Sequence, residues 1–180
     1  HFSGEKSLAV SVIDNKGRII HQWPIDWFEL WPNPDHLLYS RKPKSQPGTM
    51  IHGAEITTNG DLIFNFEYLG MLRLDACGKV RWRLAELSHH SIHIDEQETI
   101  WTSINQFHHF SEQPRAMHGP YYTEAFITQI SPDGKVLEKK SLIDIFEKNN
   151  YYGALYLSSL NNTLPNVKGV IINGGPNNVI

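Results

Sequence analysis

Hydrophobic and polar positions follow a regular order along the chain, and three segments share one arrangement of them. In each, an apolar stretch leads into a polar turn that ends in glycine, and a second apolar stretch follows. These segments span residues 11–20, 72–80 and 127–136. Glycine at the last turn position supplies the positive φ that such turns require, and a preceding Asp or Ser can hydrogen-bond the turn backbone. The pattern predicts three β-hairpins.

A longer repeat contains these hairpins. His90 follows His52 by 38 positions, and Ile100, which begins an apolar stretch, follows Leu62 by the same number. The two repeats therefore align without a gap, from the histidine to the strand that follows it. A period of about 40 residues is typical of the blades of β-propellers.

The repeat and the hairpins together predict an all-β fold, a β-propeller fragment of two and a half to three four-stranded blades. Residues 52–84 form one blade and residues 90–141 another, while residues 8–23 form the last two strands of an earlier blade. The whole chain is then one partial propeller domain. A Ser cap and apolar residues at helical spacing predict one short outer helix over residues 141–149. The structure of the tail, residues 150–180, is left open.

The two histidines of the repeat stand at the start of first strands, the innermost strands of each blade. In an antiparallel meander, the connection into strand one and the connection between strands two and three open on the same face. Two long connections, residues 24–50 and 105–123, open on this face, and such loops are usually functional or disordered. They carry cationic, aromatic and histidine side chains: Trp27, Trp31, Arg41, Lys42, Lys44, His108, His109, Arg115, His118 and Tyr121. We therefore expect His52 and His90 at one mouth of the channel, in a site suited to an aromatic anion.

Simpler explanations of these residues stay open. A histidine at a strand start can serve only to hydrogen-bond a loop carbonyl. Strand alternation places His89 and His93 on one face about 13 Å apart, at roughly 3.3 Å per residue, with His90 on the other face. We therefore expect no metal bound by all three, and no other cofactor, although histidines of the second long connection are an alternative metal site. Trp82 and Trp101 are taken as core residues.

Composition narrows the classes of function. With 40% hydrophobic and 19% charged residues, the chain is typical of a soluble globular protein. Its net charge of -3, without a basic stripe, argues against nucleic-acid binding. No run of about 18 apolar residues exists, so we expect no membrane segment. The single cysteine, Cys77, excludes an intramolecular disulfide. Because the sequence begins at His1, we expect the chain to continue upstream and the missing chain to supply the remaining blades.

A series of short motifs then occurs in a fixed order along the chain. They are Gly17-Arg-Ile-Ile-His21-Gln-Trp23-Pro24, His52-Gly53, Asn59-Gly60-Asp61-Leu62, Leu74-Asp75-Ala-Cys77-Gly78-Lys-Val-Arg-Trp82-Arg83 and His89-His90-Ser91-Ile92-His93. From about Val12 to Asn149 the sequence resembles the arylsulfotransferase family of bacterial propeller proteins. The resemblance implies a six-bladed propeller in the periplasm or otherwise outside the cytoplasm. It also implies transfer of a sulfuryl group from an aryl sulfate to a phenol, without a nucleotide donor, through a sulfated histidine.

The resemblance further implies that histidines and an arginine at the channel mouth carry the chemistry. Neutral imidazole is a competent nucleophile near pH 7, and neighbouring donors can stabilise charge on the sulfuryl oxygens. By position, we predict that His52 and His90 are catalytic. The side chains that we predict to bind the small-molecule aryl sulfate and phenol are His89, Arg41, Arg115 and His118.

One departure from the family pattern favours a different function. The resemblance leads us to expect a further histidine, in a His-x-Asn-Asp pattern followed by Val, at the start of the next blade. The nearest counterpart, residues 175–179, reads Gly-Pro-Asn-Asn-Val. The alternative function is therefore a catalytically inactive propeller that serves as a binding or structural module. A quinoprotein-like oxidoreductase is a third reading, but the paired cysteines and repeated Trp motifs of that group are absent.

Overall fold

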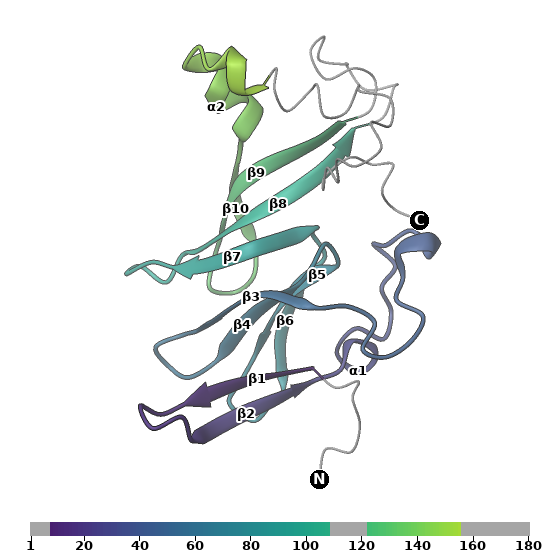
Figure 1. The fold of residues 1–180 in the computed structure, drawn as a ribbon, viewed down its shortest axis with the longest axis vertical. Helices are drawn as coiled ribbons and strands as arrows, with labels where there is room; N and C mark the ends of the chain where they lie inside the picture. The colour runs from purple at the N-terminus through teal and green to yellow at the C-terminus, as the bar shows by residue number, and fades with distance from the viewer. Residues whose placement is uncertain (1–7, 109–121, 156–180) are drawn as a thin grey trace.

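The computed structural model describes residues 8–108 and 122–155, which form three antiparallel sheets (Figure 1). The first sheet pairs β1 (Leu8–Ile13) with β2 (Ile19–Ile25). The second contains, in order, β3 (Ile51–Ile56), β4 (Leu62–Phe66), β5 (Gly70–Leu74) and β6 (Val80–Leu84). The third contains, in order, β7 (Ser88–Ile94), β8 (Ile100–His108), β9 (Tyr122–Ile130) and β10 (Val136–Ser141). Two short helices, α1 (Trp27–Leu30) and α2 (Leu142–Lys148), and the 3-10 helix η1 (Tyr39–Arg41) lie outside the sheets.

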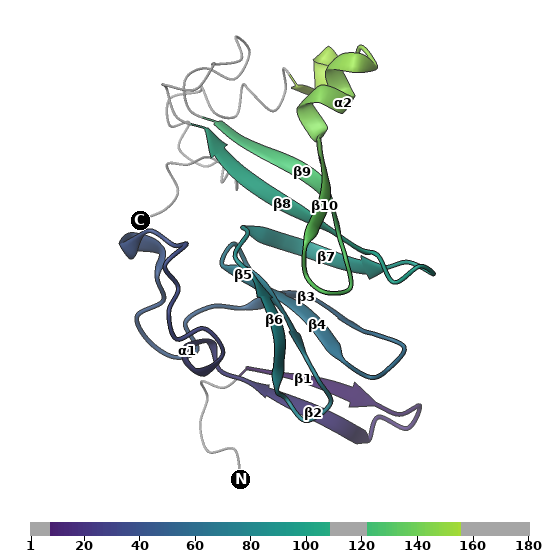
Figure 2. The same cartoon turned by 180° about the vertical axis from the view of Figure 1, so that it is seen from behind.

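The three sheets stack along the long axis of the molecule, so that β3 of the second sheet contacts β7 of the third (Figures 1 and 2). The predicted all-β class is confirmed, and the arrangement is consistent with a propeller fragment. The 38-residue repeat is visible in the strand pairing. Ile56 lies opposite Leu62 in the second sheet, and Ile94 lies opposite Ile100 in the third.

The middle sheet is buried on both faces, which explains the composition of β4. Leu62, Phe64 and Phe66 point into a core shared with β2 and α1, while Ile63 points into a second core shared with β7, β8 and β9. A strand covered on both faces reads as a continuous apolar run, whereas a half-exposed strand alternates. The one polar residue within this run is Asn65, which is completely buried.

Tryptophans at the outer strands join neighbouring sheets by the same kind of hydrogen bond. Trp23 on β2 donates its indole N–H to the carbonyl of Asp75, in the β5–β6 turn, at 2.9 Å. Trp82 on β6 donates to the carbonyl of Pro132, in the β9–β10 turn, at 3.0 Å. Gly134 in that turn has φ 84°, and a Cβ there would lie 2.6 Å from the Trp82 ring. The turns predicted from glycine therefore also dock one sheet against the next.

The predicted outer helix is present as α2. Ser141 caps it by accepting a hydrogen bond from the Asp144 amide at 3.1 Å. Ser141 also donates to the buried carboxylate of Glu124 on β9, which fixes the start of the helix to the third sheet. Within the described residues, no helix is long and apolar enough to cross a membrane.

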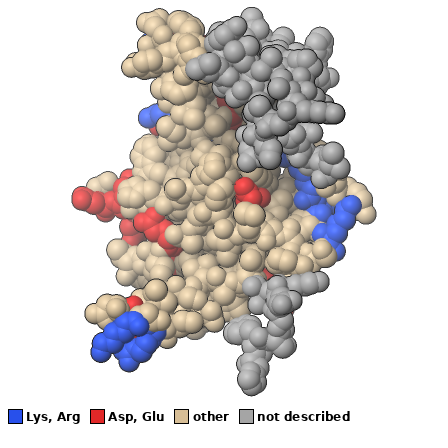
Figure 3. Space-filling model, viewed as in Figure 1, with Lys and Arg blue, Asp and Glu red and all other residues tan. Residues whose placement is uncertain are grey.

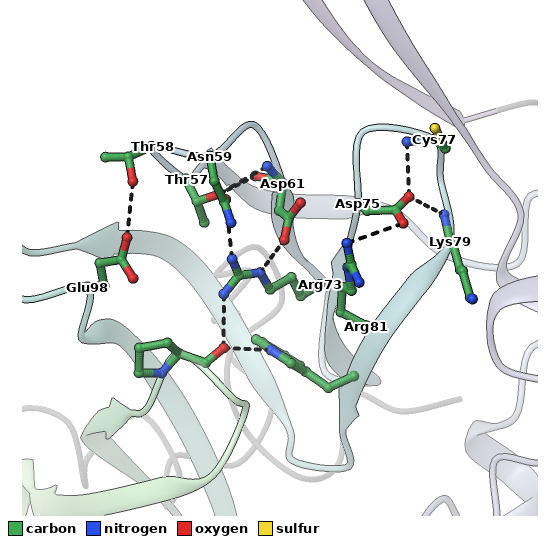
Figure 4. Close-up of polar contacts among 12 residues, drawn as sticks. Thr57, Thr58, Asn59, Asp61, Arg73, Asp75, Cys77, Lys79, Arg81 and Glu98 are labelled. Atoms are coloured by element: carbon green, nitrogen blue, oxygen red, sulfur yellow. Dashed lines mark hydrogen bonds and ion pairs between the residues drawn. The ribbon is translucent and has the colours of Figure 1, made fainter.

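An ion pair stabilises the turn-bearing end of the sheets (Figure 4). Arg73 on β5 donates through Nε to the carboxylate of Asp61 at 2.8 Å, and both side chains are largely buried. The same guanidinium donates to the carbonyl of Pro132 at 3.0 Å and to the side chain of Asn59 at 3.3 Å. Arg73 thus links β5 and the β3–β4 turn of the second sheet to a turn of the third.

Replacing Arg73 with Met should lower the free energy of unfolding by about 3 kcal/mol, because Asp61 would keep a buried charge without its partner. The matched control is Arg81→Met on the adjacent strand. The Arg81 side chain is 56% exposed and lies 3.7 Å from Asp75, so its loss should cost less than about 0.5 kcal/mol. Urea unfolding followed by tryptophan fluorescence measures both values. Equal losses in the two variants would contradict the role given to Arg73.

Candidate functional site

Both repeat histidines lie at β-bulges near the start of first strands. In the second sheet, Ile51 pairs with Phe66 and Gly53 with Asn65, which leaves His52 as the extra residue. In the third sheet, His89 pairs with Ser103 and Ile92 with Thr102, which leaves His90 and Ser91 unpaired. Bulges redirect side chains and are frequent beside active sites.

The two histidines, 38 residues apart in sequence, are in direct contact. Nε2 of His52 lies 3.2 Å from Nδ1 of His90, within hydrogen-bonding distance. The ring centroids are 4.5 Å apart and the rings meet edge to face. Both residues are exposed, so the pair is open to solvent on one side. The structure therefore brings together the two residues predicted to be catalytic.

A close approach of two backbones creates this contact. A Cβ on Gly53 would lie 2.2 Å from the carbonyl oxygen of His90, so only glycine fits there. The side chain of Asn65 spans the gap: Oδ1 accepts from the Gly53 amide at 2.9 Å, and Nδ2 donates to the His90 carbonyl at 3.0 Å. His90 itself has φ 60°, in the left-handed region that costs energy for a residue with a side chain. Asn65 and Gly53 thus hold His90 in its unusual conformation.

A carboxylate lies behind His52. Oε1 of Glu67 is 3.4 Å from Nδ1 of His52, the ring nitrogen that faces away from His90. Glu67 is held at the end of β4, where its amide donates to the carbonyl of Met50 at 3.1 Å. Sequence reasoning identified neither Glu67 nor Asn65. A polar residue inside the run Phe64-Asn65-Phe66 was the available signal, because a buried amide must find partners.

His89 lies behind His90 and is only 6% exposed. The alternation rule predicted that the two rings would face opposite ways, and this is wrong: their centroids are 4.4 Å apart, because the bulge interrupts the alternation. Nε2 of His89 lies 2.7 Å from Oδ1 of Asn105 and 3.1 Å from Oγ of Ser103, and the ring stacks on Tyr68. Among the described residues, its Nδ1 has no hydrogen-bond partner.

Burial lowers the pKa of His89, and the neighbouring His90 and His52 act in the same direction, whereas the hydrogen bond to Asn105 opposes the shift. The ring is therefore neutral near pH 7. With Nε2 donating to the Asn105 oxygen, Nδ1 carries the free lone pair. His93, by contrast, is exposed and pairs with Trp101 further along the strand, away from the pair.

Arg41 approaches the same side of the third sheet. Its guanidinium lies 3.9 Å from the centre of the Phe107 ring, a cation–π contact. Phe107 stands two positions beyond Asn105 on β8, so both side chains belong to one face of the strand, the face that contacts His89. Figure 3 shows Lys and Arg atoms gathered over the segment that contains η1. Desolvation lowers the pKa of Arg41, but a guanidinium stays charged at neutral pH.

The tryptophans of the first long connection do not line the site. Trp27 and Trp31 are 1% and 5% exposed, stack on each other and pack against the core of the second sheet. The expectation that the aromatic side chains of this connection lie at the site is therefore wrong for these two residues. They anchor the connection to the core. The Trp31 ring packs so closely against Gly70 that a Cβ on Gly70 would lie 2.4 Å from it. The exposed residues of the connection include Leu38 and Tyr39, which lie next to Arg41 in and beside η1.

The other predicted residues are placed as follows. Arg115 and His118, as well as His109 and Tyr121, lie outside the described residues, and so does the Gly-Pro-Asn-Asn-Val segment. His108 belongs to a separate cluster, where Nε2 lies 2.7 Å from the Glu124 carboxylate and the ring stacks on Tyr122. Over residues 8–108 and 122–155, no three His, Cys, Asp or Glu side chains are grouped as a metal site would require.

The lowered pKa of His89 predicts how stability changes with pH. An unfolded histidine binds a proton near pH 6.5, while buried His89 resists it, so the unfolded state binds more protons below that pH. The free energy of unfolding should therefore be highest above about pH 7 and fall as the pH drops toward 5. Urea unfolding at several pH values measures this slope.

His89→Gln should make that slope shallower. The control is His93→Gln, which removes an exposed histidine from the same strand and should keep the slope of the parent protein. If both variants keep the full slope, His89 is not the group responsible.

Comparisons with known proteins place the chain in a family. The family model described as Arylsulfotransferase (ASST) matches residues 50–168. No curated protein has significant sequence similarity to the chain. Among solved structures, a protein of unknown function from Bacteroides caccae aligns with a TM-score of 0.47 and 13% identity, over 77% of this chain and 38% of that one. The chain thus spans well under half the length of that protein. Because the family model matches about two thirds of the sequence, the chain belongs to the arylsulfotransferase (ASST) family.

Proposed function

We propose that this protein transfers a sulfuryl group from an aryl sulfate ester to a phenolic acceptor through a sulfated histidine, and that His52 and His90 form the reacting centre. The observation that carries the proposal is the direct contact of two exposed imidazoles at equivalent positions of neighbouring sheets. Family membership supports an aryl substrate.

The chemistry needs a nucleophile and a neighbouring proton carrier. One imidazole nitrogen attacks sulfur, a new S–N bond forms, and the S–O bond to the aryl group breaks with its electron pair leaving on the phenolate. The second imidazole takes the proton that the attacking ring releases and gives it to the departing oxygen. In the return half, the acceptor phenol loses its proton to the second imidazole and its oxygen attacks sulfur. The S–N bond breaks as the second imidazole returns that proton to the first ring. Two imidazoles whose nitrogens lie 3.2 Å apart can perform both roles.

Cations stabilise the sulfuryl oxygens as charge develops on them. Arg41 is the predicted substrate-binding cation that the structure describes on this side, and we propose that Arg115 and His118 assist it. His89, which was predicted to touch substrate, is buried behind His90. We therefore assign it to orienting His90 instead of contacting the sulfate. The proposal uses no nucleotide and no metal, and it includes an extracytoplasmic location, which the family resemblance supports.

His52→Ala and His90→Ala should each lower the turnover of a chromogenic phenyl sulfate by about 10²-fold or more, the scale of general acid–base and electrostatic contributions. The assay uses the protein as it is naturally expressed, with a second phenol as acceptor. His93→Ala is the matched control, because it removes an exposed histidine of the same strand away from the pair. Circular dichroism checks that all three variants stay folded.

Two results bear on the alternative. Mass spectrometry of rapidly quenched protein should find a sulfated histidine peptide in the parent protein. If folded His52→Ala and His90→Ala variants instead keep near-parental rates, these histidines are structural. If the parent protein shows no transfer with any aryl sulfate, the inactive binding module becomes the better description.

A further inference from the structure

The hydrogen bond between His52 and His90 allows two opposite proton orders. In one, His52 carries its proton on Nε2 and donates to Nδ1 of His90. In the other, His90 carries its proton on Nδ1 and donates to Nε2 of His52. A neutral imidazole has one protonated and one bare nitrogen, so each order also fixes the outward nitrogens. Only the second order leaves the outward nitrogen of His90, Nε2, bare and nucleophilic, because in the first order the bare nitrogen is Nδ1, which accepts from His52.

Glu67 selects between these orders. Its carboxylate lies 3.4 Å from Nδ1 of His52, so a proton on that nitrogen is attracted, while a lone pair there would face a negative charge. With the proton on Nδ1, Nε2 of His52 is bare and can only accept. Nδ1 of His90 must then donate, which leaves the lone pair on Nε2 of His90. A carboxylate fixes the tautomer of a catalytic histidine in the same way in serine protease triads.

We propose that Glu67 is a positioning residue that sets this proton order, and that Nε2 of His90 is the nucleophilic atom of the site. Its role in sulfuryl transfer rests on the function proposed above. His90 is exposed, and no described residue hydrogen-bonds its Nε2. Within the part of the chain that the structure describes, this nitrogen is therefore available to a substrate.

The fold holds His90 in the orientation that this order needs. Asn65 binds the His90 carbonyl at 3.0 Å and is itself fixed by the Gly53 amide, so the bulge cannot relax into ordinary strand pairing. Buried His89 packs against the His90 ring on another side. The ring of His90 is thus supported by the rings of His89 and His52, and its Nδ1 is committed to His52.

The step then balances with named atoms. The lone pair on Nε2 of His90 forms the S–N bond as the S–O bond to the aryl group breaks, and the phenolate leaves with that electron pair. The positive charge that develops on the His90 ring is relieved when its Nδ1 proton moves to Nε2 of His52. The resulting imidazolium of His52 lies beside the Glu67 carboxylate, which stabilises it. The imidazolium of His52 then gives this proton to the departing phenolate oxygen or to solvent.

Nitrogen NMR of protein labelled with ¹⁵N in the histidine rings tests the proton order without any substrate. Above pH 7, His90 should be protonated at Nδ1 and bare at Nε2, and the His90→Gln variant assigns its signals. This is the minor tautomer of an unconstrained histidine, so its dominance would be diagnostic. In Glu67→Gln a large share of His90 should revert to the Nε2–H form. A parent protein with His90 protonated at Nε2, or a Glu67→Gln variant with unchanged signals, would overturn the proposal.

Reaction with diethyl pyrocarbonate measures nucleophilicity without sulfuryl chemistry. Peptide mass spectrometry should show His90 as modified faster than His52, and Glu67→Gln should slow modification of His90 by about tenfold, much less than the loss a wrong tautomer causes in a buried triad. Glu98→Gln is the matched control: it removes the same charge at the other end of these sheets, where Glu98 contacts Thr58. Equal rates in the Glu67 and Glu98 variants would contradict the role of Glu67.

These measurements separate failure of this inference from failure of the proposed function. If Nε2 of His90 is bare and reactive and depends on Glu67, but no aryl sulfate is turned over, the proton order stands and sulfuryl transfer is wrong. If the protein transfers sulfuryl groups while the Glu67→Gln variant keeps the parental tautomer and reactivity, the transfer stands and the role of Glu67 is wrong.

Discussion

The site depends on one close approach, that of the β3 and β7 backbones at Gly53 and His90. Any side chain on Gly53 would overlap the His90 carbonyl. That carbonyl, turned inward by a left-handed residue, would be unsatisfied without the Asn65 amide. Because Oδ1 of Asn65 accepts from the Gly53 amide, the same side chain links β3 and β7 at the level of the histidines. The contact between His52 and His90 follows from this geometry.

The same constraint couples the site to the packing of the sheets. Asn65 lies in a strand whose other side chains fill cores on both faces, so its amide has no access to water. An isolated second sheet would satisfy only the Gly53 half of this amide and would leave the other half without its partner. Docking of the third sheet therefore completes the hydrogen bonding of Asn65 and assembles the histidine pair in one event.

Much of this architecture could be predicted from the sequence, because it depends on local and periodic signals. Glycine turns identified the hairpins, the 38-residue spacing related the two four-stranded sheets, and Ser141 marked the start of α2. The relation of His89 to His90 could not be predicted, because a bulge of two residues breaks the alternation on which the argument relied. The burial of Trp27 and Trp31 could not be predicted, because aromatic residues in a long connection can either line a site or anchor the connection to the core. The role of Glu67 could not be predicted, because a single carboxylate after a strand belongs to no recognisable sequence motif.

Contacts that stabilise the fold lie at one end of the sheets, and the candidate site lies at the other. At the turn-bearing end, hydrogen bonds from Arg73 and Trp82 converge on the Pro132 carbonyl and hold neighbouring sheets together. At the histidine end, His90 and Tyr68 both adopt left-handed backbone conformations, and polar groups remain exposed. Backbone strain persists only where the surrounding structure enforces it, and the Asn65 bridge to the His90 carbonyl does so here. The histidine end can therefore hold two imidazoles in contact and leave both exposed to solvent, which is the arrangement that a nucleophile and its proton acceptor require.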